Sequence, residues 1–460
     1  MLFAKHQTGL VFFPAFDWAI SPTHPEREER LLYTQDQILE EGILDIDGIH
    51  ELKAEVVEIA DVQRVHFCVP DPWKIMTESH FISAGGAKTI GKAVMNQSIE
   101  RGFALVRPPG HHAMRVAHGG RGFCNVNNEA IMIEYLRRAY GIRRVAVIDT
   151  DCHHGDGTQD IYWHDRDTLF ISIHQDGRTL YPGSGMADEA GGPNAYGTTL
   201  NIPLPPYTSQ EGFIHVIQEA VLPILDEFKP ELIVNSAGQD NHFTDPLTNM
   251  NFCAQGYARM TALLKPDIAV LEGGYSIEGA LPYVNVGIIL ALAGIDFRYV
   301  CEPDYNPESL RQTKEITADV KLACQRVLKT WKNREATREK LIGDKKVDER
   351  RRSIFYDTDG IYENQFETLQ LCRDCSGALK IDSRADTGAH VLAVHIPLNA
   401  CPDCIDIANQ WYESADLKKF DAIYLQDRPE DAYRVRNKGH RARETRIRQG
   451  LSGRQASGKT

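Results

Sequence analysis

The chain has 460 residues, of which 42% are hydrophobic and 25% are charged, and these proportions are ordinary for a globular protein with a sizeable core. Its formal net charge of −13 argues against nucleic-acid binding by the whole chain and is compatible with a basic substrate such as a lysine-rich segment or a polyamine. The N-terminal segment has no signal-peptide layout, and the longest apolar run, Val286–Ile295, is shorter than the roughly 20 residues that cross a bilayer. We therefore expect a cytoplasmic protein that does not contact a membrane.

Between residues 101 and 275, short apolar runs alternate with longer amphipathic stretches such as 129–140 and 211–228. Wholly apolar strands that alternate with helices are typical of a parallel sheet covered on both faces. Polar segments follow most of the runs, and ligands bind at the carboxyl ends of strands in such sheets, so we expect these segments to form one site. The predicted strands are Phe103–Val106, Val145–Ile148, Leu169–Ile173, Thr199–Ile202, Leu232–Val234 and Ile268–Leu271.

A run of acidic and histidine residues, from Asp149 to Asp156, follows the second predicted strand. If that strand continues, Asp149, Asp151 and His153 point to one side. Neighbouring carboxylates repel unless a cation or a proton lies between them, and Asp combined with His suits Zn²⁺ or a similar divalent metal. Asp240, after the fifth predicted strand, is placed to complete a three-ligand site with an open position for water. The alternative is a polar loop whose hydrogen bonds are satisfied internally.

Two adjacent histidines, His111 and His112, follow the first predicted strand on a Pro-Pro-Gly turn. A zinc site with two carboxylate ligands needs a separate general base, and this histidine pair is suited to that role. A histidine that acts as a base is usually oriented by a carboxylate, which Asp149 or Asp156 could provide. Tyr275, after the last predicted strand, is placed to stabilise an oxyanion, although a tyrosine packed in a turn is the alternative.

Five motifs occur along the chain in the order RPPGHHA, GFCNVNNEA, DTDCHHGDG, SAGQD and LEGGY. Two shorter segments precede them, namely His24-Pro25-Glu26 followed by Arg30, and the Ser-Ala-Gly-Gly sequence at 83–86. Together these segments closely resemble the zinc-dependent histone deacetylases and their acetylpolyamine amidohydrolase relatives. The resemblance covers about residues 1–300 and implies an α/β arginase-deacetylase fold, with an open eight-stranded parallel sheet flanked by helices.

The resemblance also implies two metal sites in this part of the chain. Asp151, His153 and Asp240 would bind the catalytic Zn²⁺. A structural K⁺ would lie near Asp149, Asp151, His153 and Ser172 and would be held partly by backbone oxygens.

The catalytic roles that the resemblance implies fall on the histidine pair and the tyrosine. His112 would act first as general base and then as general acid, paired with Asp156. His111 would be its electrostatic partner, paired with Asp149. Tyr275 would polarise the acetyl carbonyl, and it matches the active members of the family, whereas a subgroup with poor activity has His there.

The resemblance further implies a tunnel for the acyl-lysine stem, walled by Gly122 and Phe123 with Tyr181 opposite. Many family members have Phe in place of Tyr181, so we expect a more polar rim here. Leu247 occupies the position where a polyamine-selective relative carries Glu, which favours acyl-lysine in a peptide. The segment 114–121 is longer than in many relatives, and we expect it near the tunnel mouth.

Beyond residue 304 the composition changes, and the sequence predicts three further segments. Residues 305–350 are highly charged, with apolar positions at helical spacing, and predict a helical connector. Two C-x-x-C pairs predict a structural Zn²⁺ in a zinc-ribbon-like module over 351–430, the alternative being reduced cysteines in ordinary packing. Residues 431–460 are basic and then Gly/Ser-rich, and we expect a disordered tail. The paired cysteines are Cys372, Cys375, Cys401 and Cys404.

We therefore expect residues 1–304 to be a deacetylase domain that removes acetyl or related acyl groups from the ε-amino group of lysine in proteins or peptides. One alternative substrate is an acetylpolyamine or another small acetylated amine. A second alternative is a non-catalytic scaffold that contacts a protein or a nucleic acid through the zinc ribbon and the basic tail.

Overall fold

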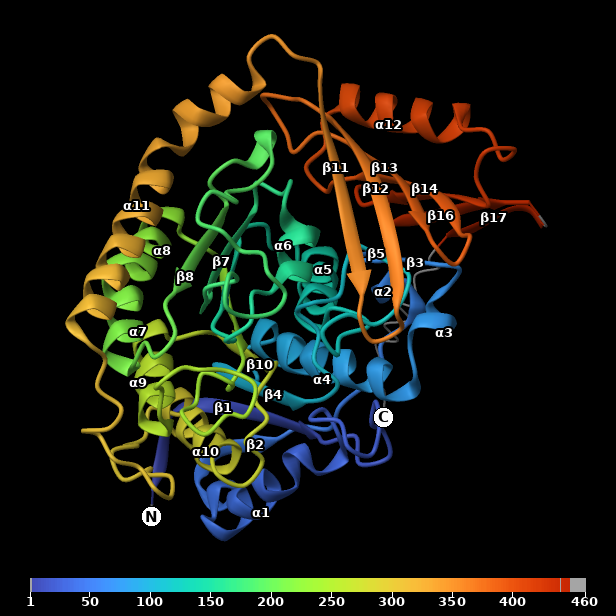
Figure 1. Ribbon diagram of the computed structural model, residues 1–460. Coiled ribbons are helices and arrows are strands. Elements are labelled where there is room, and N and C mark those ends of the chain that lie inside the picture. The colour runs from blue at the N-terminus through green and yellow to red at the C-terminus, as the bar shows by residue number, and fades with distance from the viewer. Residues whose placement is uncertain (1, 439, 447–460) are drawn as a thin grey trace, which may run out of the picture.

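A computed structural model describes residues 2–438 and 440–446, and its largest element is an eight-stranded sheet (Figure 1). Every neighbouring pair of strands is parallel, in the order β2-β1-β4-β10-β9-β6-β7-β8. All six predicted strands are present, and the structure adds two at one edge, β1 and β2. The expected α/β fold with an eight-stranded parallel sheet is confirmed. The strands are β1 Phe3–Phe13, β2 Asp47–Glu51, β4 Arg101–Val106, β6 Val145–Asp149, β7 Thr168–Gln175, β8 Thr199–Leu204, β9 Leu232–Ala237 and β10 Ile268–Leu271.

Helices cover both faces of this sheet and bury one apolar core on each. One core includes side chains of α4 and α5, and the other includes side chains of α1 and α7 to α11. The expected charged helix is α11, which buries Val320, Cys324, Val327 and Trp331 in the second core, as their spacing predicts. The helices are α1 Leu32–Glu40, α2 Ile59–Gln63, α3 Pro72–Ile75, α4 Glu78–Met95, α5 Asn128–Tyr140, α6 Asp156–Tyr162, α7 Gln210–Val216, α8 Leu222–Phe228, α9 Ala254–Leu264, α10 Leu281–Leu292 and α11 Lys314–Ile342.

A second sheet forms the C-terminal module, residues 347–446, at the upper right of Figure 1. Its strands follow the chain order from β11 to β17 and pair antiparallel, except for the parallel pair β14 and β15, which α12 connects. The elements are β11 Val347–Tyr356, β12 Ile361–Gln370, β13 Leu379–Ala385, β14 His390–Ile396, α12 Pro402–Ser414, β15 Ala422–Asp427, β16 Ala432–Asn437 and β17 His440–Arg446.

The four paired cysteines come together in this module, between β12 and β13 and at the start of α12. The Sγ atoms of Cys372 and Cys401 are 3.9 Å apart, and those of Cys375 and Cys404 are 3.6 Å apart. All four sulfurs lie within 4.8 Å of one another. This arrangement is compatible with a zinc-ribbon-like site. The cysteines belong to a module with a seven-stranded sheet, which is larger than a zinc ribbon alone.

The expected disordered tail is wrong for the start of the segment from 431 onward. Residues 432–437 form β16, which pairs with the buried strand β15, and 440–446 form β17 at the edge of the sheet. Strand pairing supplies the order that the basic composition alone does not predict, because the backbone groups find partners in the sheet. The rest of the predicted tail, residues 447–460, lies outside the described residues.

The C-terminal module is joined to the main domain, residues 2–342, by a shared apolar core. Phe67 and Val116 of the short β3–β5 ladder pack with Leu369, Ile381 and Tyr424 of the module. Strand β3 is Phe67–Cys68 and β5 is Val116–Ala117. Among the residues that the structure describes, no helix combines the length and the apolar character needed to cross a membrane.

Candidate active site

The predicted reactive residues lie after four strands that are direct neighbours in the sheet, in the order β4-β10-β9-β6. His111 and His112 follow β4, Tyr275 follows β10 and Asp240 follows β9. The acidic segment begins with Asp149, the last residue of β6. Because these strands are parallel, their carboxyl ends share one edge, and the loops meet there as expected.

Asp151, His153 and Asp240 form a compact set of buried ligand atoms, all within 4.8 Å of one another. The His153 Nδ1 atom lies 2.8 Å from Asp240 Oδ2 and 3.3 Å from Asp151 Oδ1. Both carboxylates are fully buried, so their charges need a nearby cation. Two carboxylates and one imidazole are a donor set that suits Zn²⁺ and leaves a coordination position open.

Glycines keep the space around these carboxylates free. A Cβ at Gly238 would lie 2.0 Å from Asp151 Oδ2, and a Cβ at Gly273 would lie 2.4 Å from Asp240 Oδ2. Any side chain at these two positions would displace the carboxylates. The local backbone therefore fits a bound ion held by this set.

Each histidine of the pair is oriented by its own carboxylate. His111 Nδ1 lies 3.1 Å from Asp149 Oδ2, and His112 Nδ1 lies 2.7 Å from Asp156 Oδ1. Burial and the neighbouring His111 lower the pKa of His112 to about 4, although Asp156 opposes this shift. His112 is therefore neutral near pH 7 and can accept a proton on Nε2 while Nδ1 faces Asp156.

Arg121 also belongs to this arrangement, although the sequence alone does not predict a role for it. Its Nη2 donates to Asp156 Oδ2 at 2.6 Å, opposite the oxygen that faces His112. Burial opposes ionisation of Asp156, but Arg121 and His112 outweigh it and hold the pKa of that carboxyl below its usual range. Nothing in the local sequence signals this ion pair, because Arg121 and Asp156 belong to different loops.

A second group of residues outside the predicted set holds the loops in place. Glu272 Oε2 accepts the backbone N–H groups of Gly110 and His111 at 2.8 and 3.0 Å. Arg30 donates to the carbonyl of Gly274 at 2.7 Å and pairs with the buried Glu26. Both Glu26 and Glu272 lie inside the sequence motifs described above, but the motifs alone do not predict these contacts.

Tyr275 and the predicted tunnel residues surround the histidine pair. Tyr275 is 8% exposed, and its hydroxyl has no hydrogen-bond partner among the described residues. The ring of Phe123 packs edge-on against Tyr275 at 5.6 Å, and that of Tyr181 packs edge-on against His112 at 5.2 Å. Gly122 has a φ of +52°, and a Cβ there would collide with the ring of His112 at 2.4 Å.

Leu247 and the predicted potassium ligands are also placed by the structure. Leu247 is half-buried in the loop after Asp240, and its N–H donates to Asp245, which also accepts the N–H of Tyr275. Ser172 lies beside Asp149 in the β6–β7 ladder, and its hydroxyl is 2.8 Å from Nδ1 of His174. The potassium site stays a prediction.

Comparison with known proteins agrees with this geometry. A family model described as "Histone deacetylase domain" matches residues 72–285. A protein of Archaeoglobus fulgidus named "Probable deacetylase" is 45% identical over 345 residues, which cover 68% of this chain and 94% of that protein. The chain belongs to the histone deacetylase family.

More distant members show the same likeness. The "Histone deacetylase-like amidohydrolase" of Pseudomonas aeruginosa is 37% identical over 46% of this chain and 58% of its own length. The crystal structure of the HDA15 HD domain superposes with a TM-score of 0.62 at 26% identity, covering 73% of this chain and 98% of that one. The protein is thus a hydrolase of the deacetylase type, and dependence on zinc is a property of this family.

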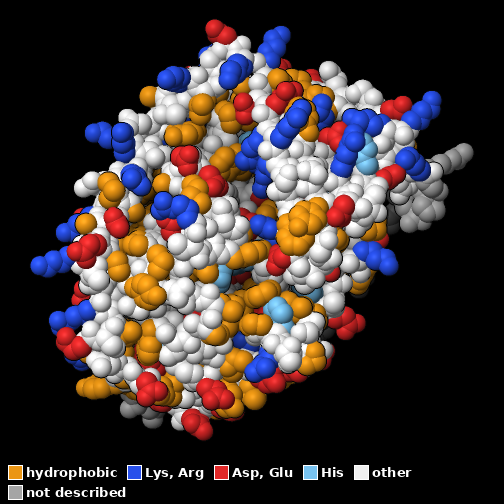
Figure 2. All heavy atoms as spheres, in the orientation of Figure 1, with side chains coloured by type: hydrophobic (Ala, Val, Ile, Leu, Met, Phe, Trp, Pro, Cys, Tyr) orange, Lys and Arg blue, Asp and Glu red, His pale blue; other side chains and the backbone are white. Residues whose placement is uncertain are grey.

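The C-terminal module, which lies outside the matched residues 72–285, contributes to the mouth of this histone deacetylase site. The turn between β11 and β12 places Asp357 where its Oδ1 accepts the Tyr181 hydroxyl at 2.9 Å and the Gly122 N–H at 3.1 Å. The neighbouring Asp359 accepts the N–H of Gly120 at 2.6 Å. The surface is hollowed between the main domain and the module on this face (Figure 2). The turn therefore braces both predicted tunnel walls from outside the family domain.

We expect the acid limb of the pH profile of kcat/KM to have its midpoint nearer 4 than 6.5, because His112 must be neutral to accept a proton and its pKa is about 4. Activity should therefore stay level from neutral pH downward until His112 protonates. The measurement is kcat/KM against pH with zinc content determined at each point, since loss of metal would mimic the limb. A midpoint at or above 6.5 with full zinc would contradict the neutral His112.

We expect Asp357→Ala to raise KM several-fold with little change in kcat, because it frees Tyr181 and Gly122 at the mouth and leaves His112 and Tyr275 untouched. Steady-state kinetics on an acetyl-lysine peptide measures the effect. The matched control is Asp344→Ala, an exposed aspartate just before β11, which should change neither constant. An unchanged KM in Asp357→Ala would show that the turn does not shape the mouth.

Proposed function

We propose that this protein removes acetyl or related acyl groups from the ε-amino group of lysine in peptides or proteins. The observation that carries the proposal is the meeting of three metal-type ligands, two His–Asp pairs and Tyr275 at one edge of the sheet. The half-buried Leu247 supports a peptide substrate, because it places no carboxylate in its loop position to bind a second amine. The complete set also favours catalysis over the role of a non-catalytic scaffold.

The catalytic zinc, held by Asp151, His153 and Asp240, would polarise the acyl carbonyl and acidify the attacking water. His112 takes the proton of that water on Nε2, and Asp156 stabilises the imidazolium that forms. The hydroxyl of Tyr275 donates a hydrogen bond to the carbonyl oxygen as it becomes an oxyanion. The protonated His112 then returns its proton to the amine nitrogen as the C–N bond breaks, which releases lysine and the carboxylate.

A small acetylated amine is the second candidate substrate. Two observations favour it: Asp357 adds a carboxylate at the mouth, and one relative is named an amidohydrolase. A cationic amine such as a polyamine would be attracted to that carboxylate. An acetyl-lysine peptide and a small acetylated amine would contact the mouth differently. Turnover of both substrates in one reaction therefore shows which of them the protein prefers.

The cysteine cluster would hold a second, structural zinc, because four thiolates close a tetrahedral shell and leave no position for substrate. The potassium site, the cytoplasmic location, and contact of the module or its basic end with a protein or nucleic acid stay predictions. Each of them is independent of the catalytic proposal.

We expect Tyr275→Phe to lower kcat on an acetyl-lysine peptide by roughly 10²–10³-fold with full zinc, because it removes one oxyanion donor. The control is Tyr299→Phe, which alters a tyrosine that is 88% exposed and should leave kcat unchanged. Wild-type turnover of the peptide and of an acetylpolyamine in the same reaction gives the substrate preference. Preferential use of the polyamine would replace the leading proposal with the second, and no turnover of either would favour the scaffold.

We expect the purified protein to contain about two zinc equivalents, one for each proposed site. Cys375→Ser should lose one equivalent and unfold at a lower temperature, while Cys301→Ser, which changes an exposed cysteine, should do neither. Asp240→Ala should instead lose the catalytic equivalent and all activity. An Asp240→Ala variant that keeps both metal and full activity would overturn the assigned site.

A further inference from the structure

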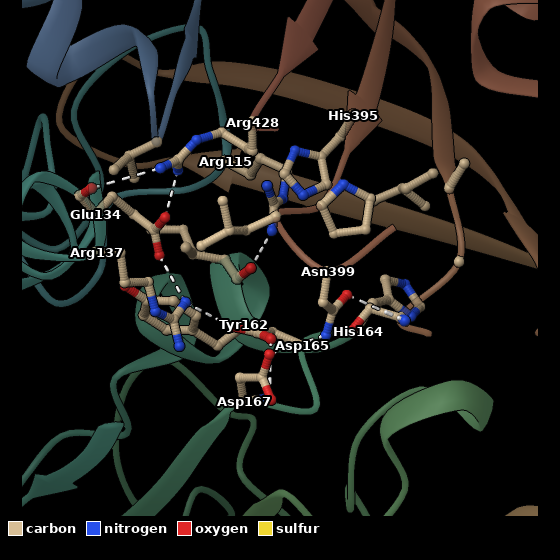
Figure 3. A pocket seen from close by; sticks show the side chains of 18 of the residues that line it. Arg115, Glu134, Arg137, Tyr162, His164, Asp165, Asp167, His395, Asn399 and Arg428 are labelled. Carbon is tan, nitrogen blue, oxygen red and sulfur yellow. Dashed lines mark hydrogen bonds and ion pairs between the residues drawn. The ribbon is translucent and has the colours of Figure 1, made fainter. Parts of the chain in front are cut away.

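A cavity of about 50 Å³ lies between the main domain and the C-terminal module (Figure 3). One wall comes from α5, the end of α6 and the loop that follows it, and the other from module segments next to the paired cysteines. The wall includes residues 376–379, directly after Cys375, and 397–399, just before Cys401. Arg143 and Leu398 lie at its exposed rim, so the cavity is close to solvent.

Every arginine on the cavity wall except Arg115 has a carboxylate in contact with its guanidinium. Arg137 pairs with Glu134 at 2.8 Å and with Asp165 at 2.7 Å, and Arg428 pairs with the second oxygen of Glu134. Arg115 is only 6% exposed, yet no carboxylate of the described residues lies within 4.0 Å of its guanidinium. The other arginines on the wall are paired, Arg64 with Asp431 and Arg143 with Asp167.

Arg115 is therefore a buried cation with no carboxylate in contact with its guanidinium, and Asp160, Glu134 and Asp165 attract it only from further away. Its guanidinium donates to the carbonyl of Ile161, and its Nε has no partner. Burial lowers the pKa of Arg115, since removal from water disfavours the charged form. A buried charge of this kind is costly to leave uncompensated.

Several further donors on the same wall also lack partners. The Nε atoms of Arg137 and Arg428 and the hydroxyl of Tyr162 are buried and make no hydrogen bond. Figure 3 shows Arg115 and Arg428 beside His395 on one side of the cavity and Tyr162 near its middle. Guanidinium and hydroxyl donors that converge on a small space are suited to the oxygens of an anion.

The size of the cavity restricts what can bind. A water molecule needs about 10–15 Å³ on this measure, so the space holds a few waters or one small ion. A nucleotide or a peptide side chain with its backbone does not fit. Water would satisfy the donors but would leave the charge of Arg115 unbalanced.

We propose that this cavity binds a small oxyanion of the size of phosphate or acetate, which neutralises Arg115 and ties the C-terminal module to the main domain. Donors from both parts contribute, because Arg115 and Tyr162 belong to the main domain and Arg428 to the module. Bound anion therefore stabilises the docked arrangement by binding the folded state alone.

The test is thermal unfolding of the full zinc-loaded chain in sodium phosphate, sodium acetate or sodium chloride at matched ionic strength. Wild-type protein should show a saturable rise in the midpoint of roughly 2 °C or more in phosphate or acetate over chloride, and whichever oxyanion saturates at lower concentration is the preferred class. Arg115→Met should abolish the rise. In chloride alone this variant should unfold at the same or a higher temperature than wild type, because it removes an uncompensated buried charge.

The control is Arg298→Met, which removes an arginine that is 78% exposed and pairs with Asp296 far from the cavity, and it should keep the full response. If Arg115→Met does not fold, Tyr162→Phe keeps every charge and should weaken the apparent phosphate affinity about fivefold. An equal effect of chloride, no oxyanion effect in wild type, or a full response in Arg115→Met or in Tyr162→Phe would each overturn the proposal.

Discussion

Two carboxylates, Asp151 and Asp240, are buried side by side at the carboxyl edge of the sheet, where burial and the charge of Asp151 raise the pKa of Asp240. His153 lies between them, within 3.3 Å of both. Their remaining oxygens accept backbone N–H groups, including that of Gly273 at 2.7 Å. Carboxylates buried this close together need a cation or a proton between them, and the missing Cβ at Gly238 keeps the space around them free for an ion.

The two carboxylates also explain why the proposed general base, His112, is a residue outside the metal-ligand set. With two anionic ligands, a zinc ion retains little net charge and acidifies its water less than a site with three histidines. In the proposed mechanism His112 accepts the proton, and its low pKa keeps it neutral near pH 7. Arg121 donates to the far oxygen of Asp156, and burial keeps the pKa of His112 low although Asp156 raises it.

Short apolar strands and the residues after them were predictable from the sequence, because parallel strands buried on both faces leave a distinct pattern. Strand β1 was missed because only its middle, residues 8–11, is fully buried and the rest alternates with exposed residues. Strand β11 was missed because five of its ten residues, such as Arg351 and Glu349, are charged, as suits the exposed edge of a sheet. The four cysteines were found because their spacing is local, whereas the sheet around them depends on pairing between distant segments.

Contacts between the tunnel and the module could not be predicted at all. The Tyr181–Asp357 hydrogen bond joins residues 176 positions apart, and neither residue has a local signal for the other. The structure also gives a reason for the long segment 114–121, which the sequence showed only as a departure from relatives. Met114 packs against Tyr356 of the module, and the Tyr356 hydroxyl lies 2.6 Å from the carbonyl oxygen of Val116. The longer segment 114–121 and the C-terminal module are thus in direct contact with each other.

This contact decides whether the β11–β12 turn acts as a fixed wall or as a moving lid. A lid would have to separate from Gly122 and Tyr181 at low cost, as loops with few buried contacts do. The turn instead joins strands whose side chains Ile354 and Tyr356 share an apolar cluster with Met114 of the main domain, and Tyr356 is fully buried. Withdrawing Asp357 would expose that apolar surface to water at about 25 cal/mol per Å². The proposed mouth is therefore preformed, with a rim that the C-terminal module helps to build.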